Sequence, residues 1–400
     1  MVSQTVSLST ARRVLARVHG LDEPAHTSGF EGVVSVFNRH QCVQSDPIEV
    51  AGRNADLTLF SRVFSYRPEY LPALLYRERK LFEYFCKMHS IMPIELYPIF
   101  KHKMSAYSKR KRIVSFLRKY KKQTRRVLNA LEDGPVCSRD VVGMGRMKTG
   151  WGHDANLSNI ILSRLWITGR VAISYREGAT KFYALTEKVI PKKILETEPP
   201  EKKDELLEIT NIIVKASRFV TAKGGPEQWY QVGGSRRVGG MLEELEQRGR
   251  VGSLYVEGLD EKFYVPIEDA DEWEKPCERR EDYVRFMAPL DPVIWNRKVF
   301  AAIYGREYAW EVYKKEHDRK YGYYSLPIIY NDNYVALIDP FFRKTDRVLE
   351  VRNFHVLDSK ISRPQFLDAL GREMDRFRSY LGAEGVEVKR APSWIVEAIT

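Results

Sequence analysis

One segment of this sequence recurs about 80 residues further along the chain, and this repeat limits the possible folds most strongly. The two copies are 162–183 and 241–264. In the first copy a predicted helix ends at Gly169 and a hairpin turns at Gly178; in the second copy Gly249 and Gly258 take these places. Glycine readily adopts the backbone conformation that ends a helix or closes a tight turn. A helix followed by a strand, a wing and a strand is typical of a winged helix, and two such units predict a duplex nucleic acid as ligand.

Length and composition narrow the class of protein further. The 400 residues contain 44% hydrophobic and 30% charged residues, which is ordinary for a chain of several globular domains. The four cysteines lack the spacing of a metal site or a disulfide framework, which favours a reducing, cytoplasmic setting: Cys42, Cys86, Cys137 and Cys277. No run approaches the roughly 18 apolar residues of a membrane span. We therefore expect a cytoplasmic monomer with no metal, no cofactor and no membrane partner.

The positive charge of the chain is concentrated in one segment, 101–126. This segment contains twelve of the 65 basic residues and no acid, so the other 53 basic residues equal the 53 acidic ones. Apolar residues between the basic ones predict a helix with one buried stripe and one basic face. Such a face binds phosphates strongly and without sequence preference, although a merely solvated helix surface is the alternative. The predicted DNA contacts are Lys109, Arg110, Lys111, Arg112, Arg118, Lys119, Lys121 and Lys122.

The order of the predicted elements suggests a mainly helical α+β protein, with tandem winged helices on a helical scaffold and a C-terminal α+β domain. The expected segments are an N-terminal helical domain, two winged helices and the C-terminal domain, at 1–120, 121–195, 204–268 and 282–400. The expected helices are 11–19, capped by Ser9 or Thr10, then 32–39, 68–88, 124–131, 156–166 and 363–381. Strands 321–327 and 334–339 flank a turn at 331–333. The wings and Trp151–His153 are further candidates for contacting a duplex.

Motifs for nucleotide hydrolysis, dinucleotide binding and zinc proteolysis are missing, and a polar cluster at 40–47 remains as a candidate site. Around this cluster the sequence resembles the winged-helix DNA glycosylases of the AlkZ/YcaQ type. The matching blocks keep their order along nearly the whole chain: 42–48, 60–63, 83–85, 93, 97–98, 289–291, 294–297, 304–305, 310–313, 319–324, 326–327 and 338–340.

The resemblance implies a monofunctional glycosylase that releases N7-alkylated purines from double-stranded DNA, and in some members unhooks interstrand crosslinks. The catalytic motif of the family is Gln, an aliphatic residue, then Gln or Asp, which corresponds here to Gln44-Ser45-Asp46. Asp46 would accept the proton of the attacking water and oppose the positive charge of the sugar. The amide of Gln44 would orient that water by donating and accepting hydrogen bonds.

This chain departs from the family pattern in two places. The middle residue of the motif is Ser45, and Lys87 stands where the family carries a histidine, with His89 two positions later. Lys87, His89 and Arg62 are candidates for residues near the substrate. A lysine at a sugar could form a Schiff base, but a basic residue near phosphate is the simpler interpretation of Lys87. Arg62 is expected to pair with an acid or a phosphate, with Glu83 as one possible partner.

Two other functions compete with the glycosylase. A transcription regulator would use its winged helices to read the major groove, but this hypothesis gives the C-terminal domain and the Gln-Ser-Asp cluster no task. A scaffold that uses its wings for protein contacts is a weaker alternative, because the concentrated basic segment favours nucleic acid.

Overall fold

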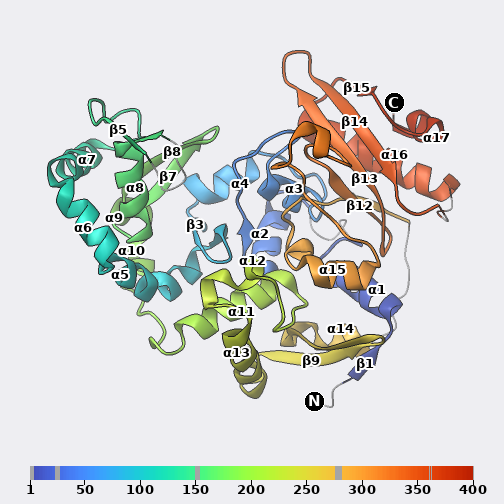
Figure 1. The fold of residues 1–400 in the computed structure, drawn as a ribbon, viewed down its shortest axis with the longest axis horizontal. Coiled ribbons are helices and arrows are strands. Elements are labelled where there is room, and N and C mark those ends of the chain that lie inside the picture. The colour runs from blue at the N-terminus through green and yellow to red at the C-terminus, as the bar shows by residue number, and fades with distance from the viewer. Residues whose placement is uncertain are drawn as a thin grey trace. The chain divides into compact units, whose positions relative to one another are not determined.

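The computed structural model describes residues 4–22, 28–148, 154–274, 282–359, 361 and 363–399 (Figure 1). The chain forms two compact units. The first contains Met1–Tyr70, Cys86–Met88 and Thr210–Thr400, and the second contains Leu71–Phe85 and His89–Ile209. Helices and strands are mixed, as the α+β class predicts. The four-segment division stays a prediction, and Trp151–His153 lie outside the described residues.

The first unit begins with the predicted helical scaffold. Its first elements are α1 (Leu8–Val18), α2 (Gly29–His40), β2 (Val43–Gln44) and α3 (Asn54–Phe60). The predicted cap of α1 was wrong by two or three residues. Ser7 is the cap, because its backbone is extended and its side-chain oxygen accepts a hydrogen bond of 3.1 Å from the N–H of Thr10.

The second copy of the repeat also lies in this unit. It covers the second half of α13 (Ser235–Gln247), β9 (Val251–Val256) and most of β10 (Leu259–Pro266). It is preceded in this unit by α12 (Pro226–Trp229) and by the part of α11 (Glu205–Ser217) that follows Ile209. Gly249 and Gly258 have φ values of 66° and 78°, the left-handed conformation that the repeat predicts. The N-terminal strand β1 (Gln4–Val6) pairs in parallel with β9, so the sheet order is β1-β9-β10.

The C-terminal part of the first unit is built on a five-stranded sheet with the order β11-β12-β13-β14-β15. The strands are β11 (Val284–Phe286), β12 (Leu326–Tyr330), β13 (Asn333–Arg343), β14 (Val348–Val356) and β15 (Gly385–Val388). The helices are α14 (Ala270–Glu274), α15 (Arg297–Tyr304), α16 (Arg363–Leu381) and α17 (Ser393–Ile399), and α16 has its predicted bounds. Figure 1 shows α16 packed against this sheet.

The strand predicted for 321–327 was wrong over its first five residues, because β12 begins at Leu326. Side-chain carboxylates hold the backbone of 321–324 instead of a neighbouring strand. Glu311 accepts a hydrogen bond from the N–H of Tyr321, and Asp339 accepts bonds from the N–H groups of Tyr323 and Tyr324. This segment is therefore a tethered loop.

The second unit starts with a short helical turn and a hairpin. A π-helical turn, Ala73–Arg77, leads to strands β3 (Leu81–Phe85) and β4 (His89–Pro93), which pair antiparallel. The helix predicted for 68–88 was therefore wrong over its second half. Leu81 to Tyr84 are buried in succession, so both faces of this stretch are covered, and a short apolar run of that kind fits a strand as well as a helix.

The rest of the second unit carries the basic segment and the first copy of the repeat. The helices are α5 (Lys101–Ser108), α6 (Lys111–Lys119), α7 (Lys121–Asp133), α8 (Leu157–Ile167), α9 (Thr186–Val189) and α10 (Lys192–Glu196). The strands form two hairpins, β5 (Arg146–Lys148) with β6 (Asp154–Asn156), and β7 (Val171–Glu177) with β8 (Thr180–Leu185). Gly169 has φ 72°, and a Cβ there would lie 2.7 Å from the sulfur of Met104. Glycine is needed at this helix end for both reasons.

A buried ion pair joins distant parts of the first unit. Both guanidinium Nη atoms of Arg62, just after α3, bind the carboxylate of Asp291 at 2.7 and 2.8 Å, and neither side chain is more than 1% exposed. Arg62 also donates to the carbonyl of Thr58, and Asp291 accepts from the N–H of Val293. The pair therefore fixes the loop before α15 to the N-terminal helices. The sequence had left Glu83 open as a partner of Arg62, but the partner is Asp291.

Removal of one member of this pair should destabilise the first unit strongly. Replacing Arg62 by Met leaves the Asp291 carboxylate buried without its partner, and we expect the free energy of unfolding to fall by about 3–5 kcal/mol. The matched control is Arg53→Met, which removes an arginine from an exposed pair with Glu49 and should cost less than about 1 kcal/mol. Urea denaturation followed by circular dichroism measures both. Equal losses in the two variants would contradict a structural role for the buried pair.

Candidate active site

The proposed catalytic motif lies in the first unit, where α2 ends and the chain turns into β2. Gln41 takes a left-handed conformation with φ 60° and ends the helix by donating its N–H to the carbonyl of Phe37. The next residues, Cys42 and Val43, are completely buried and anchor the turn. A left-handed residue other than glycine is uncommon and carries strain. The backbone just before Gln44 is thus fixed by a helix end and by two core side chains.

Two side chains hold Gln44, one at its backbone carbonyl and one at its side-chain amide. The amide nitrogen of Asn54 donates to the backbone carbonyl of Gln44 at 2.9 Å, while the amide oxygen of Asn54 accepts from the N–H of Leu290 at 2.8 Å. At the other end, Nζ of Lys87 donates to Oε1 of Gln44 at 2.7 Å. Gln44 is 7% exposed, Asn54 1% and Lys87 4%, so these contacts are shielded from water.

Asp46 is held more loosely than Gln44. Its side chain is half-buried, and Oδ1 accepts a hydrogen bond of 2.9 Å from the N–H of Ile48. Burial raises the pKa of this carboxyl above its ordinary value, and the single backbone hydrogen bond opposes that effect only in part. A carboxylate with a raised pKa is a better proton acceptor than one at the surface.

Aromatic side chains from the C-terminal part of the first unit lie within the electrostatic reach of Asp46. Burial and the negative charge of Asp46 raise the pKa of Tyr324, and the same two causes raise the pKa of Tyr313. Tyr324 is buried, whereas Tyr313 is 82% exposed and packs edge-on against Trp310 with ring centroids 5.7 Å apart. The sequence interpretation treated 321–324 as a packed strand and missed this proximity. The signal available was that these aromatics lie in the blocks that match the family.

Two of the three residues predicted near the substrate have structural partners. Arg62 is enclosed by its pair with Asp291. His89 belongs to the second unit, where its Nε2 lies 2.9 Å from a carboxylate oxygen of Glu83. Burial lowers the pKa of His89 although Glu83 opposes this effect. Lys87 is the one of the three that contacts the proposed catalytic motif.

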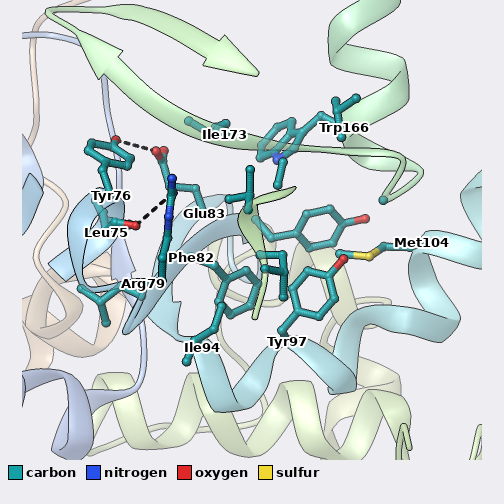
Figure 2. Close-up of a pocket in the computed structure, with 17 residues that line it drawn as sticks. Leu75, Tyr76, Arg79, Phe82, Glu83, Ile94, Tyr97, Met104, Trp166 and Ile173 are labelled. Atoms are coloured by element: carbon teal, nitrogen blue, oxygen red, sulfur yellow. Dashed lines mark hydrogen bonds between the residues drawn. The ribbon is translucent and has the colours of Figure 1, made fainter. Parts of the chain in front are cut away.

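Glu83 links the β3–β4 hairpin to strand β7 through Arg176. Figure 2 shows its carboxylate hydrogen-bonded to the hydroxyl of Tyr76. Its carboxylate accepts hydrogen bonds from the hydroxyl of Tyr76 at 2.9 Å and from two guanidinium nitrogens of Arg176 on β7. Burial would raise the pKa of Glu83, but contacts with His89 and Arg176 outweigh it and hold that pKa well below its ordinary value. The adjoining cavity is lined by Phe82, Tyr97 and other core side chains and has a volume of about 20 Å³, enough for about one water molecule. We therefore assign Glu83 a structural role.

Another titratable side chain of the β7–β8 hairpin is Lys181 on β8. Its Nζ lies 5.0 Å from the centre of the Trp166 ring. Burial, together with the positive charge of Arg176, lowers the pKa of Lys181 to about 8.

The predicted phosphate-binding residues lie on two helices and the connection before them instead of on one helix. Lys109 and Arg110 connect α5 to α6, and the others lie on α6 or at the start of α7. All eight are exposed. The predicted buried stripe of α6 is reduced to Ile113, since Val114 is exposed and Phe116 and Leu117 are only partly buried. Lys101 and Lys103, at the other end of the segment, donate to backbone carbonyls of Thr197 and Phe85 and are occupied within the fold.

The described ranges contain neither a candidate metal site nor a helix that could span a membrane. In these ranges no three His, Cys, Asp or Glu side chains gather closely enough to bind a metal ion. No helix there has both the length and the apolar character needed to cross a bilayer.

Comparisons with known proteins show to which family the chain belongs. The structure of the DNA glycosylase AlkZ from Streptomyces sahachiroi superposes with a TM-score of 0.64 at 14% sequence identity, and the match covers 97% of this chain and 100% of that one. At this identity the likeness establishes a shared fold. The family model described as DNA glycosylase AlkZ-like matches residues 37–380, which include Gln44, Asp46, Lys87 and the basic segment. The chain therefore belongs to the AlkZ-like DNA glycosylase family.

Proposed function

We propose that this DNA glycosylase hydrolyses the N-glycosidic bond of N7-alkylated purines in duplex DNA, with Asp46 as the general base. The observation that carries the proposal is the environment of its carboxylate. One oxygen of Asp46 binds the N–H of Ile48, and the other has no hydrogen-bond partner among the described residues. A half-buried carboxylate with a free oxygen suits both tasks of the reaction, to accept a proton from water and to face a positively charged sugar.

Hydrolysis of this bond requires few groups besides a carboxylate and a water molecule. Alkylation at N7 gives the purine a positive charge, so the base departs as a neutral molecule when the C1′–N9 bond breaks and its electron pair moves to N9. The sugar becomes positively charged in the transition state, as in other glycoside hydrolyses. The water oxygen then bonds to C1′, one of its two protons passes to Asp46 and the other stays on the new hydroxyl group, which leaves free base and an abasic site. Crosslinks between N7 atoms contain the same bond, and we include them in the proposed substrate class.

Binding of the duplex is assigned to the exposed basic residues of 109–122. They carry no acidic neighbours in the sequence, so their charge is available for phosphates. The aromatic stacking of Arg110 on Tyr107, at 4.1 Å, orders one of these side chains before DNA arrives. Binding of this kind follows the backbone and does not read bases, as a repair enzyme requires.

The burial of α8 is evidence against the regulator hypothesis. Of the residues of α8, Asn159 is the only exposed one, and Arg164 is stacked on the Phe116 ring at 4.2 Å. A recognition helix must present several side chains to the base edges of the major groove. The helix of the first copy is therefore better suited to support the wing than to read sequence.

Replacement of Asp46 by Asn should abolish base release while leaving DNA binding intact. Asn is close in shape but cannot take up the proton of water, so we expect single-turnover release of N7-methylguanine to slow by at least about 100-fold. Affinity for the duplex should stay within a few-fold. The control is Glu49→Gln, which neutralises an acid three residues further along the same loop and should leave the rate unchanged. Equal rates for wild type and Asp46→Asn would rule out Asp46 as the base.

The same assignment predicts the pH dependence of the rate. Only the ionised carboxylate accepts a proton, and burial raises the pKa of Asp46 from its ordinary value of 3.8. The single-turnover rate, corrected for spontaneous depurination, should be constant near neutral pH and fall about tenfold per pH unit below the raised pKa. The decline must therefore begin above pH 3.8. A rate that remains constant down to that pH would contradict the assignment.

The basic segment should control the salt dependence of binding. Each phosphate contact that is lost reduces the slope of log affinity against log salt by about 0.9. A triple variant, Lys111→Gln with Lys121→Gln and Lys122→Gln, should therefore lower the slope by about 2–3. The control triple has the same change of net charge but replaces lysines that are paired with acids: Lys203→Gln, Lys262→Gln and Lys389→Gln. If both triples lower the slope equally, net charge and not this segment determines binding.

A further inference from the structure

We propose that Lys87 is a positioning residue that fixes the amide of Gln44 in one orientation, so that Gln44 serves the reaction as a hydrogen-bond donor. The inference rests on the proposed function and adds a residue to it. Nζ of Lys87 lies 2.7 Å from Oε1 of Gln44, and both side chains are buried. This contact is made to the side-chain amide of Gln44, not to its backbone.

The chemistry of the two groups determines the orientation. An amide side chain can turn over and exchange its oxygen for its nitrogen, and in most settings either end can face a partner. A lysine ammonium has three donors and no acceptor, so only Oε1 can face Lys87. The NH₂ group of Gln44 is then the end of the amide that does not face Lys87. A donor there can bind the oxygen of the attacking water, whose proton is left to Asp46.

A closed circuit of contacts among five residues fixes Lys87 and Gln44 relative to each other. Asn54 binds the carbonyl of Gln44 at 2.9 Å and the N–H of Leu290 at 2.8 Å. The carbonyl of Leu290 accepts from the indole N–H of Trp295 at 2.8 Å, and the ring of Trp295 lies 5.0 Å from Nζ of Lys87. Each of the five residues therefore contacts the next, and Lys87 closes the circuit on Gln44.

The circuit also explains how a buried ammonium is accommodated. The Trp295 ring offers a cation–π contact and the Gln44 oxygen a charge-assisted hydrogen bond. Both contacts engage the charged form of Lys87. The alternative role, an amine that attacks C1′ and forms an imine with the sugar, needs a neutral Nζ that has left Gln44.

A double-mutant cycle tests the coupling. Lys87→Met keeps the apolar stem and removes the donor, and we expect it to slow single-turnover release of N7-methylguanine by about 10- to 100-fold, with duplex affinity within threefold. Gln44→Ala should slow release at least as much. The double variant should be no slower than Gln44→Ala alone, because Lys87 acts through Gln44. Multiplication of the two effects would overturn the proposal.

Two further variants separate positioning from folding and from covalent catalysis. Lys87→Arg retains a charged donor and should recover most of the rate that Lys87→Met loses, whereas loss of rate in both with a lower unfolding midpoint would indicate a structural role. Borohydride should trap no covalent adduct between wild-type protein and DNA. An adduct that disappears in Lys87→Met would show that Lys87 is a nucleophile and would overturn the proposal.

A measurement without substrate keeps this inference separate from the proposed function. In protein labelled with ¹⁵N-glutamine, the side-chain amide signal of Gln44 is assigned by its loss in Gln44→Ala. We expect this signal to be shifted in wild type and to move toward the position of a free amide in Lys87→Met. An unmoved signal would overturn the positioning role. A wild-type protein that releases no N7-methylguanine but shows the expected shift would refute the proposed substrate and not the role of Lys87.

Discussion

The buried pair of Arg62 and Asp291 is the interaction on which the candidate site depends. It joins the end of α3 to the loop before α15 across 229 residues of sequence. That loop contains Leu290, whose N–H and carbonyl bind Asn54 and Trp295 and so support both Gln44 and Lys87. Enclosing two charges costs several kcal/mol, which a bidentate geometry and further hydrogen bonds must offset. The pair thus contributes less to net stability than to the placement of a loop that supports the residues of the candidate site.

Local patterns predicted those parts of the fold that local forces determine. Apolar periodicity and turn glycines within a single segment predict each of these elements. They are the helix, glycine and hairpin of each repeat copy, α2 and α16. The segment from Leu81 to Phe85 is not predicted in this way. Its apolar residues suit either element, and pairing with His89–Pro93 decides the outcome. The loop at 321–324 differs from its prediction for a similar reason, since Asp339 and Glu311 bind its backbone from distant positions.

The candidate site divides in the same way. Gln44 and Asp46 were predicted from the resemblance to a family, and the basic segment from its charge. The partners that give these residues their properties were not predicted. Lys87 is 43 residues from Gln44, and no pattern in the sequence indicates which end of the amide it binds. Arg62 was expected near an acid or phosphate, but its acid is Asp291 and not Glu83. Contacts of this kind arise only when the chain has folded.

The difference between two carboxylates is the reason why environment, rather than residue type, favours Asp46 over Glu83 as the proposed catalytic base. Glu83 and Asp46 both lie in blocks that match the family, and both are acids removed from bulk water. Glu83 receives hydrogen bonds from Tyr76 and Arg176 with His89 beside it, so its negative charge is neutralised and its pKa is held low. Asp46 receives one backbone hydrogen bond, and burial raises its pKa. An acid whose oxygens are all occupied can neither accept a proton from water nor oppose a positive sugar. Asp46 has one oxygen without a hydrogen-bond partner among the described residues, and this oxygen can serve both purposes.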